Sequence, residues 1–295
     1  MTISIPSKAR TAFEGNMNDR SAIELPFPCP PFFVVNGEES MEELKNILYF
    51  GGFACTTEKL QTASEHWKDA PFPIPGFVKM NHKVKGAKIE VLAARSLVVS
   101  IIGVREYSSI EDSASGRKSR MPPYTKGARP GIQVLCVLGY RDEQKAIHPW
   151  GPVMLTAQGY QVNHIKDSIQ SYRKAIKPFV KKLIPDATDS MLNLFWMYLG
   201  TFGEFQSVTV GAGNNSQSIT PIKTFIPEDL DEHKVENMYV GEGMAEFMAD
   251  LSEQSQEWLS VFTKMAATQK SNQPVVDTGY PEEPPPPDDY DSIPF

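Results

Sequence analysis

Hydrophobic positions are densest in the middle of the chain, where Val, Ile and Leu residues cluster between Gly and Pro residues from Lys88 to Val162. Apolar runs bounded in this way are typical of β-strands. The predicted strands are Leu92–Tyr107 with a break near Ala94, Ile132–Tyr140 and Val153–Val162. Because successive side chains of a strand point to opposite faces, Arg105 and Tyr107 should share one face of the sheet.

Apolar residues recur every three or four positions in two other stretches. From His164 to Leu183, Lys and Arg fill the positions between them, which predicts an amphipathic helix with a basic face. The same spacing predicts a helix at Met244–Thr268, whose apolar stripe we interpret as core packing. Shorter helices are expected at Met41–Phe50, Thr57–Lys68 and Ser190–Leu199, and strands near Phe205–Val210 and Ser218–Phe225, joined by a turn at Gly211–Ser216.

Composition divides the chain into three parts. Residues 1–75 include a Pro-rich N-terminal extension and a small helical segment, residues 76–268 form the body, and residues 269–295 have a linker composition that cannot build a core. Strands and helices together predict an α+β fold. The density of strands favours a β-barrel of the oligonucleotide/oligosaccharide-binding kind, elaborated with helices, followed by a disordered acidic tail. The pattern leaves open whether the body has one lobe or two.

Charge is strongly segregated along the chain. The formal net charge is -7, but residues 271–295 contain six acids and no Lys or Arg, which leaves 29 basic and 30 acidic residues in the rest. Residues 77–129 contain eleven Lys or Arg and four acids, whereas residues 227–258 contain ten acids and one Lys. Since Lys and Arg displace counterions from phosphates, this asymmetry predicts one basic surface for an anionic ligand.

The basic stretch also contains aromatic residues. Cations that bind the backbone and rings that stack on bases are the combination that holds a single strand of nucleic acid. The candidates for phosphate contact are Lys83, Lys85, Arg105, Arg117, Lys118, Arg120, Lys126 and Arg129, and those for stacking are Tyr107, Tyr124 and Trp150. For Trp150, packing and binding are equally good explanations. The polar stretch from Ser108 to Pro130 is expected to be a mobile basic loop.

Other chemistry has little support in the sequence. There is no Walker loop, dinucleotide fingerprint or His-Glu-x-x-His motif, and the five histidines lack metal-ligand spacing. We therefore expect no catalytic residue, no metal and no cofactor. Three widely spaced cysteines, the absence of a signal-peptide pattern and the absence of a long apolar run predict a soluble cytoplasmic protein that does not associate with a membrane.

The sequence ends in three aspartates followed by an Ile-Pro-Phe tripeptide, after a linker with four consecutive prolines. This ending resembles the acidic tip of bacterial single-stranded DNA-binding proteins, in which a run of aspartates precedes Ile-Pro-Phe. The resemblance implies an oligonucleotide-binding domain, self-association, and docking of replication and repair proteins on the tip. The residues that carry it are Asp288, Asp289, Asp291, Ile293, Pro294 and Phe295, with Tyr290 and Ser292 departing from the aspartate run.

These features together predict sequence-independent binding and protection of single-stranded DNA in replication, recombination or repair, without enzymatic activity. The protein would act in a bacterial cell or in a cell infected by a phage. Two alternatives stay open. The first is a recombination protein that accelerates annealing of complementary strands, and the second is an adaptor without DNA affinity whose tail competes for the docking pockets of host proteins.

Overall fold

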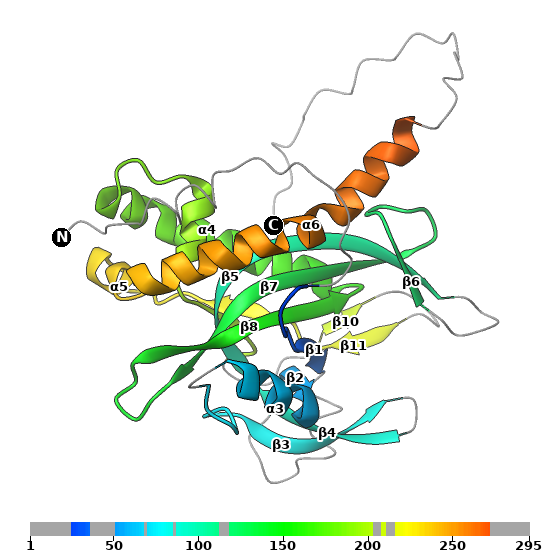
Figure 1. Cartoon of the computed structure of the whole chain (residues 1–295), viewed down its shortest axis with the longest axis horizontal. Coiled ribbons are helices and arrows are strands. Elements are labelled where there is room, and N and C mark those ends of the chain that lie inside the picture. Colours follow the sequence, from blue (N-terminus) through cyan, green and yellow to red (C-terminus); the bar gives the residue numbers. More distant parts are fainter. Residues whose placement is uncertain are drawn as a thin grey trace.

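A single curled β-sheet organises the fold in the computed structural model, which describes residues 25–35, 51–67, 70–84, 87–111, 118–202, 208–210 and 216–271. Within these residues the sheet has ten strands and curls strongly into a half-barrel (Figure 1). The strands are β1 (Pro31–Val35), β2 (Gly52–Thr56), β3 (Val78–Val84), β4 (Ala87–Ala94), β5 (Ser96–Glu111), β6 (Lys118–Met121), β7 (Arg129–Arg141), β8 (Ile147–Gln158), β9 (Met197–Gly200) and β12 (Lys223–Phe225).

The strand order shows how distant parts of the chain meet. Neighbouring strands follow the path β12-β9-β5-β7-β8-β1-β2-β4-β3, and β6 pairs with the far end of β5. All of these pairs are antiparallel except β1 with β8, which is parallel. The β1 and β2 strands, which come from the expected N-terminal extension, therefore lie inside the sheet of the body.

The three longest strands form a meander at the centre of this sheet. Strand β5 pairs with β7 from Val98 to Ser109, and β7 pairs with β8 from Gly131 to Arg141. Residues 131–139 of β7 are all buried, which is the condition of a strand covered on both faces. This explains why its sequence is an almost continuous apolar run.

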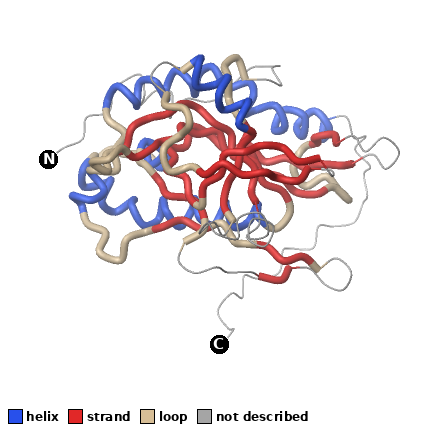
Figure 2. Tube along the Cα trace, turned by 90° about the horizontal axis from the view of Figure 1, so that it is seen from below, coloured by secondary structure: helices blue, strands red, loops and turns tan. Residues whose placement is uncertain are grey.

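Helices cover the two faces of the meander (Figure 2). Helix α4 (Gln161–Leu183) follows β8 and buries its apolar stripe, as its 3.6-residue spacing predicts. Helix α6 (Glu242–Ser271) packs along β5. Because side chains of β5 alternate, Arg105 and Tyr107 contact α6, whereas Val104 and Glu106 line a cavity together with α4.

Smaller elements complete the structure. They are α3 (Thr57–His66), the 3₁₀ helix η1 (Asp189–Leu194), α5 (Glu232–Glu236) and a separate hairpin of β10 (Val208–Val210) and β11 (Gln217–Ile219). Among the helices in the described ranges, none is long and apolar enough to cross a membrane.

The structure confirms the α+β class and the helices predicted near residues 57–68, 164–183 and 244–268. The helix predicted at Ser190–Leu199 is wrong. That segment forms η1 and then β9, because Met197 and Leu199 pair with β5 and are buried in the sheet. Part of the loop predicted between Ser108 and Pro130 is strand, because residues 108–111 end β5, residues 118–121 form β6 and residues 129–130 begin β7. Residues 122–128 form the turn between β6 and β7, and residues 112–117 lie outside the described residues. The helix predicted at Met41–Phe50 lies outside the described residues.

The close pairing of β9 with β5 gives a stability test. A Cβ atom on Gly200 would lie 2.2 Å from the carbonyl oxygen of Arg95, so the backbone itself must shift to admit a side chain. We expect Gly200→Ala to lower the free energy of unfolding by about 1–3 kcal/mol in urea titrations. Gly243→Ala is the control, because no atom lies within 4 Å of its Cβ position in α6. Equal stabilities for the two variants would contradict this packing.

Candidate functional site

A groove between α4 and β5 is lined by four Lys and Arg side chains. Its volume is about 560 Å³. It is lined by Val104, Glu106, Lys166, Ile169, Gln170, Arg173, Lys174, Lys177, Asp189 and Leu192. The apolar stripe of α4 faces the core, which places its cations at the rim of this groove. The groove therefore combines four cations with two carboxylates.

Two ion pairs and an amide position three of these cations. Lys166 Nζ lies 2.9 Å from Glu106, and this hydrogen bond raises the pKa of Lys166. Lys177 Nζ lies 2.6 Å from Asp189, which lowers the pKa of that carboxyl group. Arg173 donates to the side-chain oxygen of Asn193 at 2.6 Å. Such exposed pairs contribute little to stability.

Arg173 differs from the lysines because it is half-buried. Burial lowers the pKa of its guanidinium, although the group stays charged at neutral pH. Its Nε atom is buried and has no hydrogen-bond acceptor among the described residues. A buried donor without a partner is uncommon in proteins. Arg173 thus keeps donor capacity that the fold does not use.

Tyr124 lies beside this groove in the turn between β6 and β7. Its hydroxyl is 3.4 Å from Glu106, which lines the groove, while 87% of the residue is exposed. Its φ is 64°, in the left-handed region that costs energy for any residue with a Cβ. Strained residues of this kind cluster at binding sites. The ring offers a flat apolar surface next to cations.

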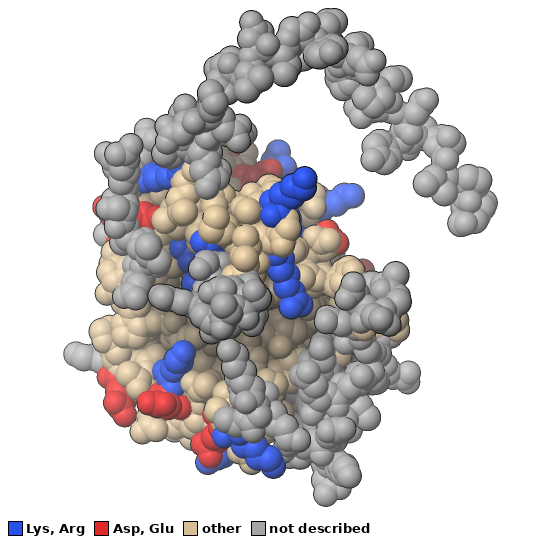
Figure 3. Space-filling model, turned by 90° about the vertical axis from the view of Figure 1, so that its right-hand side faces the viewer, with Lys and Arg blue, Asp and Glu red and all other residues tan. Residues whose placement is uncertain are grey.

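The charges of this end of the molecule are unevenly spread. Figure 3 shows one face on which Lys and Arg side chains are spread over the upper and middle part, whereas acidic side chains lie mainly toward the margin. Of the sequence candidates, Arg120, Lys126 and Arg129 are exposed near β6 and the start of β7. The Arg120 guanidinium lies 5.4 Å from the ring centre of Tyr107.

Arg105 and Tyr107 share one face as predicted, but α6 covers both. They are 3% and 1% exposed. The Arg105 guanidinium lies 3.6 Å from the ring centre of Trp258, donates to the carbonyl of Trp258 at 2.8 Å and to the Gln133 amide oxygen at 2.6 Å. Tyr107 stacks on Phe262 at 6.0 Å between ring centres. Neither side chain faces solvent, so the expectation that they form an open binding surface needs correction.

Arg105 is a buried cation held by polar atoms and a π-system. Burial, and secondarily the nearby Arg120 charge, lower the pKa of Arg105 to about 9. The group stays protonated at neutral pH, and its charge is met by the Trp258 ring and by two oxygens rather than by a carboxylate. Its contacts instead fasten α6 to the sheet.

Trp150 is also buried, at 2% exposure, and its indole N–H donates to the carbonyl of Pro71 at 3.0 Å. Packing is therefore the explanation that applies to it. Lys83 lies on β3, which five strands separate from β5 in the strand path, so the structure does not place it on a strand next to Lys118 of β6. Lys85, Arg117 and the tail residues 288–295 lie outside the described residues.

The α4 cations were missing from the sequence candidates. Lys166, Arg173, Lys174 and Lys177 had been recognised as one basic helix face, but the pattern could not show which surface that face adjoins. In the folded chain Val104 and Glu106 of β5 line the same groove as these cations. The spacing of Lys and Arg in residues 164–183 indicates a basic helix face, but it does not indicate which strand that face lies against.

The described residues contain no group of three or more His, Cys, Asp or Glu side chains that could hold a metal ion. Cys55 and Cys136 are buried, and burial raises the pKa of Cys55 to about 12. In comparisons with protein-family models, curated proteins and solved structures, no match to the chain was found. The groove and its surroundings are therefore interpreted from their own geometry.

The role of Arg105 in fastening α6 can be measured. Arg105→Ala removes two cation–π contacts and three charged hydrogen bonds, and should lower the free energy of unfolding by about 2–4 kcal/mol. Lys174→Ala, at an exposed position, should change it by less than about 0.5 kcal/mol. Urea titration followed by tryptophan fluorescence gives both values. A variant at position 105 as stable as the wild type would show that α6 is held by other contacts.

Proposed function

We propose that the chain binds single-stranded DNA without sequence preference, with the groove between α4 and β5 holding the phosphate backbone and Tyr124 stacking on a base. Arg120, Lys126 and Arg129 extend this path along β6 and β7. The protein protects single strands in replication, recombination or repair and performs no chemistry on them.

The observation that supports this most strongly is the position of Tyr124. An 87% exposed ring in a left-handed turn contributes little to the core, and its hydroxyl reaches the carboxylate of Glu106 on the groove wall. Stacking of one base on an aromatic ring contributes about 1–3 kcal/mol to binding, and cations beside the ring neutralise the phosphates of the strand. A ring next to a row of cations fits a single strand better than a duplex, whose bases are already stacked.

The chemistry of the groove also accounts for the lack of sequence preference. Lysine and arginine contact phosphates, which every nucleotide carries, and a ring face stacks on any base. The curled sheet is compatible with a barrel-type platform of the oligonucleotide-binding kind, although its strand path is longer than the five strands of that fold. We assign the sheet the role of a scaffold, because helices cover its central faces.

The acidic ending has a separate role in this proposal. Its aspartates would steer it to basic rims on replication and repair proteins, while Ile293, Pro294 and Phe295 would fill an apolar pocket there. The body would thus hold the strand and the tail would bring the enzymes that act on it. Self-association would extend the bound length of DNA.

Removing two groove cations tests the backbone contacts. The double variant Lys166→Gln and Lys174→Gln should bind a fluorescent oligothymidine about tenfold or more weakly, because two phosphate contacts are lost. The slope of log affinity against log salt should fall by about 1.4. The matched control is Lys59→Gln with Lys181→Gln, which removes the same charge outside the groove. An equal loss of affinity in both double variants would show that the groove lysines act only through the net charge of the protein.

Replacing Tyr124 tests stacking. Tyr124→Ala should weaken oligothymidine binding by about 1–3 kcal/mol and leave the free energy of unfolding within about 0.5 kcal/mol of the wild type, because the ring is exposed. Tyr124→Phe keeps the ring and should bind like the wild type. Anisotropy titrations and urea unfolding measure the two quantities. Wild-type affinity in the alanine variant would remove Tyr124 from the interface.

A further inference from the structure

A second cavity lies around the tip of the β7–β8 hairpin, β9, β12 and α5, and shares no lining residue with the groove. Its volume is about 690 Å³. Its walls carry Trp196, Tyr198, Phe202, Phe225 and Tyr239, and its rim carries Arg141, Lys145 and Lys234. Among the described residues that line this cavity, none is Asp or Glu. The cavity therefore joins aromatic walls to a basic rim.

An exposed ring marks the mouth of this cavity. Phe225 is 49% exposed on the edge strand β12, and its ring centre lies 5.8 Å from that of Phe202. Leaving half of a phenylalanine in water costs hydrophobic free energy that burial would recover. Tyr198, the register partner of Phe225, is held by a hydrogen bond from Arg141 to its hydroxyl. A flat ligand on Phe225 would thus lie close to a guanidinium.

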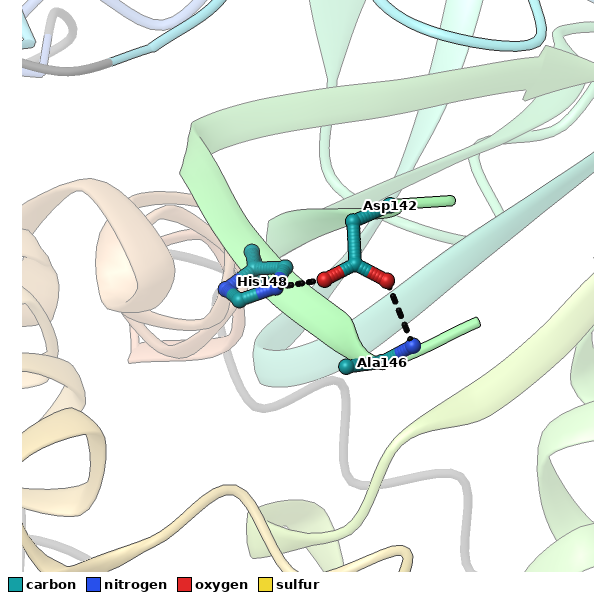
Figure 4. A network of polar contacts seen from close by, with 3 residues as sticks. All are labelled: Asp142, Ala146 and His148. Carbon is teal, nitrogen blue, oxygen red and sulfur yellow. Dashed lines mark hydrogen bonds and ion pairs between the residues drawn. The ribbon is translucent and has the colours of Figure 1, made fainter. Parts of the chain in front are cut away.

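Hydrogen bonds to Asp142 cross the tip of the β7–β8 hairpin, which carries two of the rim cations (Figure 4). Asp142 accepts hydrogen bonds from the Ala146 backbone at 2.8 Å and from His148 at 2.7 Å. The His148 bond is the main cause of the lowered pKa of Asp142. These contacts hold the backbone of the turn that contains Lys145 and follows Arg141.

Lys145 occupies its place in this turn at a conformational cost. Its φ is 67°, in the left-handed region where hairpin turns favour Gly or Asn. Within the described residues, the non-glycine residues with positive φ are Lys145 here and Tyr124 beside the groove. Backbone outliers of this kind are concentrated at functional sites. A lysine in this position, where Gly or Asn would carry less strain, points to a use for its charge.

We propose that this cavity is a second nucleotide site, in which a base stacks on Phe225 and its phosphate lies toward Arg141 and Lys145. The inference rests on the proposed single-strand binding for its ligand class, but its residues are separate from the groove. Lys234 adds less charge, because Asp229 already pairs with it. The site deepens the proposed function by giving the protein two places to hold a strand.

The geometry favours a nucleotide over an acidic peptide, the other ligand that aromatic walls and cations attract. The cavity has the volume of a site for one small ligand, and only two of its cations lack a carboxylate partner among the described contacts. A peptide with several aspartates gains most from a longer basic surface. A single nucleotide would contact both features of the cavity, with its base on an aromatic ring and its phosphate near the two cations.

Short oligonucleotides on full-length variants test the proposal. A fluorescent thymidine tetranucleotide is titrated against wild type, the pocket variant Phe225→Ala with Lys145→Gln, and the groove variant Lys166→Gln with Lys174→Gln. The pocket control is Val208→Ala with Lys59→Gln, which removes an exposed apolar side chain and a cation elsewhere. We expect two bound tetranucleotides per wild-type chain. In the pocket variant the affinity of one of the two sites should fall by about five- to 150-fold, and in the control both affinities should stay unchanged.

The outcomes separate the two sites. If the pocket variant binds the tetranucleotide like the control, the second site is rejected. The groove variant then tests the groove separately. If the groove variant still binds one tetranucleotide, and adding the pocket substitutions to it removes that binding, the second site is supported independently of the groove. A fluorescent peptide of residues 288–295 is titrated in parallel. Peptide binding that the pocket substitutions abolish, with tetranucleotide binding intact, would assign the cavity to an acidic peptide and overturn the proposal.

Discussion

The hydrogen-bonded ladder between β5 and β7 is the constraint from which the other arrangements follow. It runs from Val98 to Ser109 with one irregularity near Ile102, and it fixes which side chains of β5 point to each face. A shift of one residue would exchange those faces. In the observed register Arg105 and Tyr107 meet α6, and Glu106 meets Lys166 of α4.

Covering both faces of the meander moves any ligand surface to its edges and grooves. One face of the meander is occupied by α6, which the Arg105 guanidinium holds through Trp258. One group of accessible cations lies on the outer side of α4 and around β6, next to the exposed Tyr124. A protein that binds a flexible strand can use such a discontinuous surface, because a single strand bends to follow it.

The spacing of apolar residues predicted most helices and strands correctly, but it did not predict which elements pack against one another. The helix at residues 164–183 and the sharing of one face by Arg105 and Tyr107 follow from local spacing, which is written in the chain. Burial of Arg105, Tyr107 and Trp150 depends on segments more than 75 positions away, and charge or aromaticity alone does not reveal it. The segment at residues 190–199 failed for a similar reason, since a short apolar run fits a buried strand or a helix equally well.

The central claim is that the body binds single strands through cations and a stacking ring. Anisotropy titration of a labelled oligothymidine, compared with a duplex of equal length at low and moderate salt, tests it most directly. The account predicts tighter binding of the single strand and a marked loss of affinity as salt rises. No binding of either form would contradict it and leave the acidic ending as the working part of the chain.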